Sequence, residues 1–88
     1  MASYEVRDTN RFDPADVVVV IGTSSLALSM KSAAKYVDSA PKWKNAPKIY
    51  VKVNGIHPFR TSAAALKARP RKVLVSSFGR QITIHRLA

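Results

Sequence analysis

The stretch VVVVI, from Val17 to Ile21, is the longest apolar run in the chain and decides the fold class. Five consecutive β-branched side chains pack well on a pleated sheet and poorly on a helix, so the run predicts a buried strand. Before it, Asp13–Asp16 (DPAD) is typical of a turn or a helix start, with a capping aspartate, a proline at the first helical position and a capping-box acid. After it, Gly22–Ser25 predicts the turn that ends the strand.

The segment that follows this turn predicts a helix over residues 25–39. Leu26, Met30 and Val37 recur at helical spacing, and a serine pair precedes them as an N-cap. Leu28 also alternates with Leu26 and Met30 at period two, so a β-hairpin through the turn is the alternative.

The middle of the chain predicts a loop and then a hairpin. Residues 40–47 form a loop with prolines at positions 41 and 47. Residues 48–53 alternate between polar and apolar side chains, which predicts a half-buried strand. Asn54-Gly55 is a strong hairpin signal, and Pro58 restricts its partner, residues 56–59, to an edge or a very short strand.

The last third predicts a short helix and two strands. Residues 63–68 are rich in alanine, the Thr61-Ser62 pair offers a cap, and Pro70 ends the helix. Residues 72–77 and 81–87 then predict two strands joined by a glycine turn, and the valines of the first and the isoleucines of the second should each share a face.

Together these elements predict an α+β fold: a small antiparallel or mixed sheet of four to five strands with one or two helices packed on it. A chain of 88 residues predicts a single small domain, residues 1–88. With 47% apolar residues the chain has material for one core.

Composition narrows the class of protein. The chain has no cysteine, which excludes disulfides and thiolate metal sites. Residues 1–10 carry charges and lack the apolar region of a signal peptide, and the longest apolar run is too short for a membrane span. We expect a soluble protein, either cytoplasmic or within a virus or phage particle.

Charge is distributed very unevenly along the chain, whose net charge is +10. Residues 1–38 are near neutral, because they hold all 5 carboxylates and only four of the 15 cations. Residues 39–88 are strongly basic, because they hold the other eleven cations and no acid. Such a charge predicts an anionic partner, most commonly nucleic acid, with an acidic protein surface or a plain solvated surface as alternatives.

Lysines and arginines of the basic half, with two interspersed aromatic residues, are the candidate contacts. Cations would bind phosphates with little sequence specificity, and aromatic rings would stack on bases. The tryptophan has an alternative role as an anchor of its loop on the core. The candidate nucleic-acid contacts are Lys42, Trp43, Lys44, Lys48, Tyr50, Lys52, Lys67, Arg69, Arg71, Lys72, Arg80 and Arg86.

Catalytic and cofactor motifs are not found in the sequence. His57 and His85 are the only histidines, and we find no nucleophile–base spacing or metal-ligand pattern around them. The first turn, Gly22–Ser25, lacks the second glycine and the lysine of a nucleotide-binding loop. We therefore expect no enzyme activity, no cofactor and no metal, and we expect His85 to face outward on the last strand.

Arg11–Gly22 (RFDPADVVVVIG) resembles the aromatic-Asp-Pro-x-x-Val-x-Val-x-Ile-Gly opening of some phage tail-tube subunits. The likeness covers about a dozen residues. Thr23 stands where that family has a second glycine, and an alanine-rich segment replaces its β-rich body. The family's fold is therefore not transferred, but the resemblance favours a virion or assembly protein as an alternative function.

The sequence thus predicts a small, non-enzymatic basic protein that contacts nucleic acid. The alternative is a structural or assembly protein of a particle, or an inhibitor, which docks on an acidic protein surface, uses its strand edges and forms a homo-oligomer.

Overall fold

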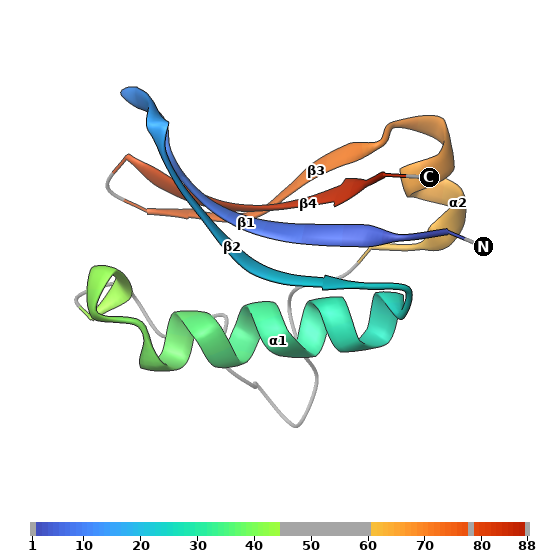
Figure 1. The fold of residues 1–88 in the computed structure, drawn as a ribbon, viewed down its shortest axis with the longest axis horizontal. Helices are drawn as coiled ribbons and strands as arrows, with labels where there is room; N and C mark the ends of the chain where they lie inside the picture. Colours follow the sequence, from blue (N-terminus) through green and yellow to red (C-terminus); the bar gives the residue numbers. More distant parts are fainter. Residues whose placement is uncertain (1, 45–60, 78, 88) are drawn as a thin grey trace.

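The computed structural model describes residues 2–44, 61–77 and 79–87. The predicted fold class is confirmed, because the described strands form one antiparallel sheet in the order β2-β1-β4-β3 with helices packed on it (Figure 1). The elements in chain order are β1 (Tyr4–Asn10), β2 (Asp13–Thr23), α1 (Leu26–Ser39), the 3₁₀ helix η1 (Pro41–Trp43), α2 (Ala63–Ala68), β3 (Arg71–Ser77) and β4 (Arg80–Arg86).

The sheet consists of two hairpins joined at its centre. β1 pairs with β2, β3 pairs with β4, and β1 pairs with β4 without interruption from Tyr4↔Arg86 to Asn10↔Arg80. In the turn before β4, Gly79 has a φ of 84°, which side-chain-bearing residues rarely adopt. In this strand order β1 and β4, the first and the last strand along the chain, are the two central strands, and β2 and β3 form the edges.

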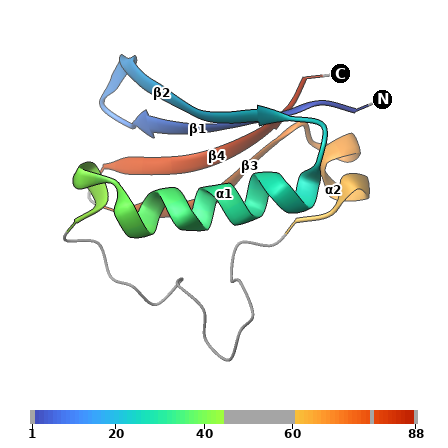
Figure 2. The ribbon, with the colours of Figure 1, turned by 60° about the horizontal axis from the view of Figure 1, so that its bottom comes forward.

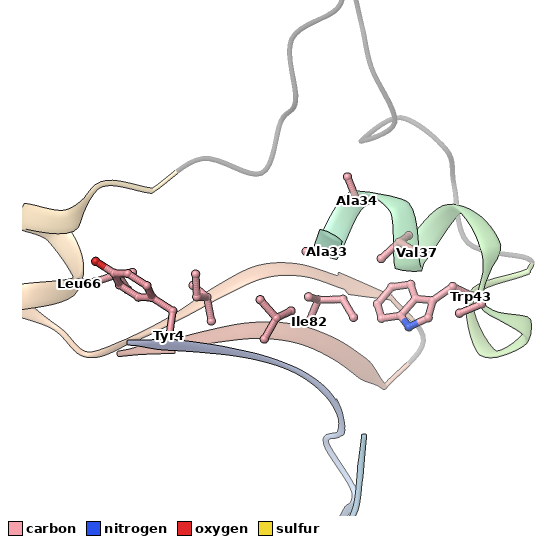
Figure 3. Packing of buried hydrophobic residues seen from close by; sticks show 10 residues of the cluster. Tyr4, Ala33, Ala34, Val37, Trp43, Leu66 and Ile82 are labelled. Carbon is pink, nitrogen blue, oxygen red and sulfur yellow. The ribbon is translucent and has the colours of Figure 1, made fainter. Parts of the chain in front are cut away.

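The helices cover one face and one end of the sheet. α1 crosses one face and contacts β1 and β2, whereas α2 lies at the end of the sheet where β3 begins (Figures 1 and 2). The opposite face carries no helix among the described residues. The buried apolar residues form a row between the sheet and α1, with Leu66 and Tyr4 at one end, Ile82 in the middle and Trp43 at the other end (Figure 3).

The two predicted helices, α1 and α2, are both confirmed. The side chain of Ser25 accepts a hydrogen bond from the Leu28 amide (3.1 Å) and caps α1. The hairpin alternative for this segment is wrong, because alanines and Val37 of α1 form one buried face. Ser62 rather than Thr61 caps α2 through the Ala65 amide (3.1 Å), and this helix ends before Pro70.

The N-terminal half differs most from the prediction. β1 occupies residues 4–10, for which no strand is predicted above. Asp13–Asp16 is part of β2 and is not a turn or a helix start, and Gly22 and Thr23 still belong to β2, so the turn lies at Ser24-Ser25.

The valine run is a strand, as predicted, but the prediction that it is buried is wrong. Val17, Val18 and Val19 are 44%, 36% and 56% exposed. β2 is an edge strand, and Val17 and Val19 lie on the sheet face away from α1, paired with Thr9 and Arg7. A β-branched run therefore identified the strand without identifying its place in the sheet.

The two C-terminal strands are confirmed, with one difference in the faces they present. Ile82 and Ile84 share the buried face, as expected. Val73 and Val75 lie on opposite faces, because a register shift pairs Val73 with Thr83 but Val75 with Ile82. The predicted strand at residues 48–53 and the hairpin to residue 59 lie outside the described residues.

Candidate functional site

At the end of the sheet near Trp43, a buried carboxylate gathers three donors. Asp8 on β1 is fully buried. It accepts hydrogen bonds from Tyr36 Oη of α1 (2.7 Å), Trp43 Nε1 of η1 (3.2 Å) and Arg80 Nε of β4 (2.9 Å). Because an unpaired buried carboxylate is costly, these three donors from separate elements are what allows Asp8 to be buried.

Arg80 also reaches a second carboxylate. Its Nη1 lies 2.7 Å from Asp16 Oδ2 on β2. Asp16 is also contacted at 3.3 Å by Asn10 Nδ2 and at 3.3 Å by Lys42 Nζ. We call this set of connected side chains the polar network; its members are Asp8, Asn10, Asp16, Tyr36, Lys42, Trp43 and Arg80.

The polar network shifts the titration of its members. Hydrogen bonding to Arg80 is the main reason why the pKa of Asp16 falls to about 2. Burial, followed by the hydrogen bond to Asp8, raises the pKa of Tyr36 to about 12. The hydrogen bond to Asp16 raises the pKa of Arg80. All three shifts stabilise the protonation states that hold the network together near neutral pH.

Two predicted nucleic-acid contacts therefore have structural roles here. Trp43 is 1% exposed, so its ring is an anchor on the core, the alternative role given above, and has no face available for stacking on a base. The Arg80 side chain is 14% exposed and paired with two acids, which corrects its assignment as a phosphate contact. Lys42 is exposed but paired with Asp16, and Lys44 is exposed beside it.

A pocket of about 380 Å³ lies at the other end of the sheet, between α2 and β3. Pro70 ends α2, and its carbonyl accepts a hydrogen bond from the Arg86 amide (2.8 Å), which fixes the chain between helix and strand. The pocket is lined by Thr61, Ala65, Leu66, Arg69, Arg71, Lys72 and Val73.

The cations of this pocket differ from Arg80 in their surroundings. Arg69, Arg71 and Lys72, which we call the basic corner, are exposed. Within the described part of the chain, neither Arg69 nor Arg71 forms an ion pair. Apolar walls with a few convergent polar groups are typical of ligand sites, and this pocket has both.

The remaining candidates are dispersed. Lys67 is exposed on α2, and Arg86 is half-buried on β4 opposite Tyr4; both flank the basic corner without lining its pocket. η1, which contains Lys42 and is followed by Lys44, lies at the opposite end of the sheet from α2 (Figure 1). Lys48, Tyr50 and Lys52 lie outside the described residues.

A hydroxyl–imidazole pair, which the sequence analysis did not identify, lies on β4. Thr83 Oγ1 is 2.8 Å from His85 Nε2, because residues two apart on a strand share a face. Burial, then the nearby charges of Arg7 and Arg71, lowers the pKa of His85. Thr83 is fully buried, so its hydroxyl is out of reach of a substrate and the pair orients the imidazole.

The sequence matches no family model, no curated protein and no solved structure. None of the helices in the described ranges is long and apolar enough to cross a membrane. The same residues hold no cluster of three or more His, Cys, Asp or Glu side chains suited to a metal ion. The geometry of the polar network and the basic corner is therefore the basis for assigning a function.

Proposed function

We propose that this chain is a small, non-enzymatic basic protein that binds nucleic acid through the basic corner, in the cytoplasm or inside a virus or phage particle. The observation that carries the proposal is the gathering of Arg69, Arg71 and Lys72 around one pocket. Guanidinium groups without a carboxylate partner can form bidentate contacts with phosphate oxygens.

Charge supports a polymeric anion over a small one. The whole chain carries +10, and Lys67 adds an exposed cation on the helix that forms one wall of the pocket. Each phosphate that a cation neutralises releases counterions from the nucleic acid, so affinity depends strongly on salt. Contacts of this kind position a strand and carry little sequence information.

The test is fluorescence anisotropy of a labelled single strand and a labelled duplex at several salt concentrations. Arg69→Ala/Arg71→Ala should reduce the slope of log affinity against log salt by about 1.4 to 1.8, the value for two lost phosphate contacts. The matched control is Lys31→Ala/Lys35→Ala, which removes two exposed cations from α1 and should leave most of the slope. An equal change in the two double variants would show that the basic corner is not the contact.

The second candidate function is a structural or assembly protein, and the β2 edge favours it. Val17, Val18 and Val19 are exposed on an edge strand, and such strands are templates for pairing with another chain. A second copy of β2 would extend the sheet, with cations elsewhere guiding docking on an acidic protein surface. Sedimentation velocity distinguishes the candidates: nuclease-resistant self-association that Val19→Lys abolishes supports assembly, and a monomer at all concentrations contradicts it.

A further inference from the structure

We infer that the pocket between α2 and β3 holds one unpaired nucleotide, with its phosphate on Arg69 and Arg71 and its base against the apolar wall. This inference rests on the proposed function and adds a substrate class to it, namely single strands or duplexes with an unpaired base.

The shape of the site favours a nucleotide over a bare phosphate group. Phosphate contacts alone need only a convex basic surface, whereas here three cations line a half-open pocket of about 380 Å³. Pockets that enclose small ligands begin at about 300 Å³. A paired base stays within its stack and cannot enter such a pocket, whereas single strands can turn their bases outward.

The chemistry of the pocket wall also suits a nucleotide. Ala65 and Val73 form an apolar surface on which the flat face of a base can lie, and Leu66 lines the pocket but is fully buried and exposes no surface of its own. Arg69 and Arg71 stand on either side of Pro70 and reach the same pocket. Guanidinium planes both stack on bases and bind phosphate, so two arginines beside an apolar wall suit both parts of a nucleotide.

One hydroxyl among the residues that line the pocket, that of Thr61, lacks a hydrogen-bond partner. Thr61 Oγ1 is buried and forms no hydrogen bond with any described residue. Buried polar atoms are almost always paired, and a hydroxyl can both donate and accept. A base edge presents both donors and acceptors, so an inserted base would satisfy this hydroxyl once the Thr61 side chain turns its oxygen, which has no exposed surface in the structure, toward the pocket.

The test fills the pocket without removing a charge. Ala65→Leu places a larger side chain in the pocket, and Ala64→Leu makes the same change at an exposed position of α2 that does not line it. Anisotropy is measured with a single strand, a duplex of the same sequence and a single strand of abasic sites, at one salt concentration. Thermal melting by circular dichroism verifies that both variants are folded.

We expect Ala65→Leu to weaken single-strand binding about tenfold while duplex and abasic-strand binding stay unchanged. Ala64→Leu should bind all three probes as the unsubstituted protein does. Equal binding of the normal and the abasic strand by the unsubstituted protein would overturn the inference, as would identical affinities of the two leucine variants for the single strand.

Two further arms separate this inference from the proposed function. If inorganic phosphate competes with the single strand as well as a nucleoside monophosphate does, the pocket recognises only the anion and the inference is wrong. If duplex and single strand bind equally with a steep salt slope, the inference fails while the proposed function stands. If neither probe binds, both fail.

Discussion

The two ends of the sheet contain arginines with opposite surroundings. At one end Arg80 lies between Asp8 and Asp16 and is nearly buried. At the other, Arg69 and Arg71 are exposed and pair with no carboxylate among the described residues. All three arginines belong to the basic half of the sequence, which holds no acid, so the acids of residues 1–38 decide which cation becomes structural.

The charges at the two ends of the sheet also differ in how much they contribute to the stability of the fold. The buried charges of the polar network are held by several hydrogen bonds, and removal of one partner leaves a charge without compensation. The cations of the basic corner face water, where each contributes little to the stability of the fold. Substitutions at the first end should therefore affect stability, and those at the second end should affect binding.

The largest effect is expected when the buried carboxylate is neutralised. Asp8→Asn keeps the shape of the side chain but removes one of the two carboxylate charges that compensate Arg80, and should cost about 3 kcal/mol of unfolding free energy, measured in urea. The control is Asp13→Asn at an exposed position of β2, expected to change stability by less than about 0.5 kcal/mol. Similar losses in both variants would contradict the role assigned to the polar network.

The next effect comes from placing an acid beside the basic corner. Ala65→Glu places a carboxylate four residues before Arg69, beside the pocket, and should weaken nucleic-acid binding about tenfold relative to Ala65→Gln. The two side chains have nearly the same size, so the difference reports charge alone. Anisotropy curves that coincide for the two variants would remove the basic corner from the interface.

Stability at extreme pH should report on the polar network. Because the pKa of Tyr36 is about 12 in the fold against 10.0 in the unfolded chain, stability should fall as pH rises from 10 to 12. Because the pKa of Asp16 is about 2 against 3.8, stability should also fall as pH drops from about 4 to 2. Melting temperatures across both windows measure the two losses.

Substitutions assign these losses to their side chains. Tyr36→Phe should reduce the alkaline loss, whereas Tyr4→Phe at the other end of the core should keep it, because Tyr36 is still present. Asp16→Asn should reduce the acid loss in the same way. An alkaline loss that is the same in Tyr36→Phe as in the unsubstituted protein would contradict the hydrogen-bond assignment.

The smallest effect concerns His85, which senses the basic corner from the neighbouring strand. The charge of Arg71 contributes to its lowered pKa, so Arg71→Ala should raise that pKa, as measured by NMR titration of the imidazole. Lys31→Ala on α1 serves as the control. The folded pKa lies below 6.5, so His85 should cost stability as pH falls below 6.5. If the pKa of His85 is the same in Arg71→Ala as in the unsubstituted protein, Arg71 is not a source of the positive charge that acts on the imidazole.

Local signals predicted part of the fold from the sequence. Serine caps and Pro70 define both described helices, because capping and proline sterics act within a few residues. The cap-like motif Asp13–Asp16 led to a wrong prediction of a turn or helix start. Its local preference is overridden in the structure, where these residues belong to β2 and pair with β1. Tyr4, Val6 and Asp8 alternate with charged or polar residues, and this period of two is typical of a strand such as β1. Because Asp8 is charged, the face that is buried in the structure does not look apolar in the sequence, and no strand is predicted there.

The candidate site likewise has a part that local sequence predicts and a part that depends on tertiary packing. The Arg69–Lys72 cluster is local, so its cations were predicted together and the structure places them together. The pairing of Asp8 with Arg80 joins residues 72 positions apart, and sequence spacing cannot show which cation meets which acid. The pocket volume and the unpaired hydroxyl of Thr61 depend on how α2 packs on the sheet, which no local pattern specifies.

The central pairing of β1 with β4 has a consequence for biosynthesis. During translation β1 emerges before the other three strands of the sheet, yet its pairing partner at the sheet centre, residues 80–86, is the last of the four to be made. Until then, of the sheet, only the β1–β2 hairpin can form. Val6 still lacks the neighbours that bury it, and Asp8 still lacks the arginine that compensates its charge in the finished protein. The sheet therefore closes only after synthesis of β4, and the nascent chain presents an apolar strand edge that other chains or chaperones can bind.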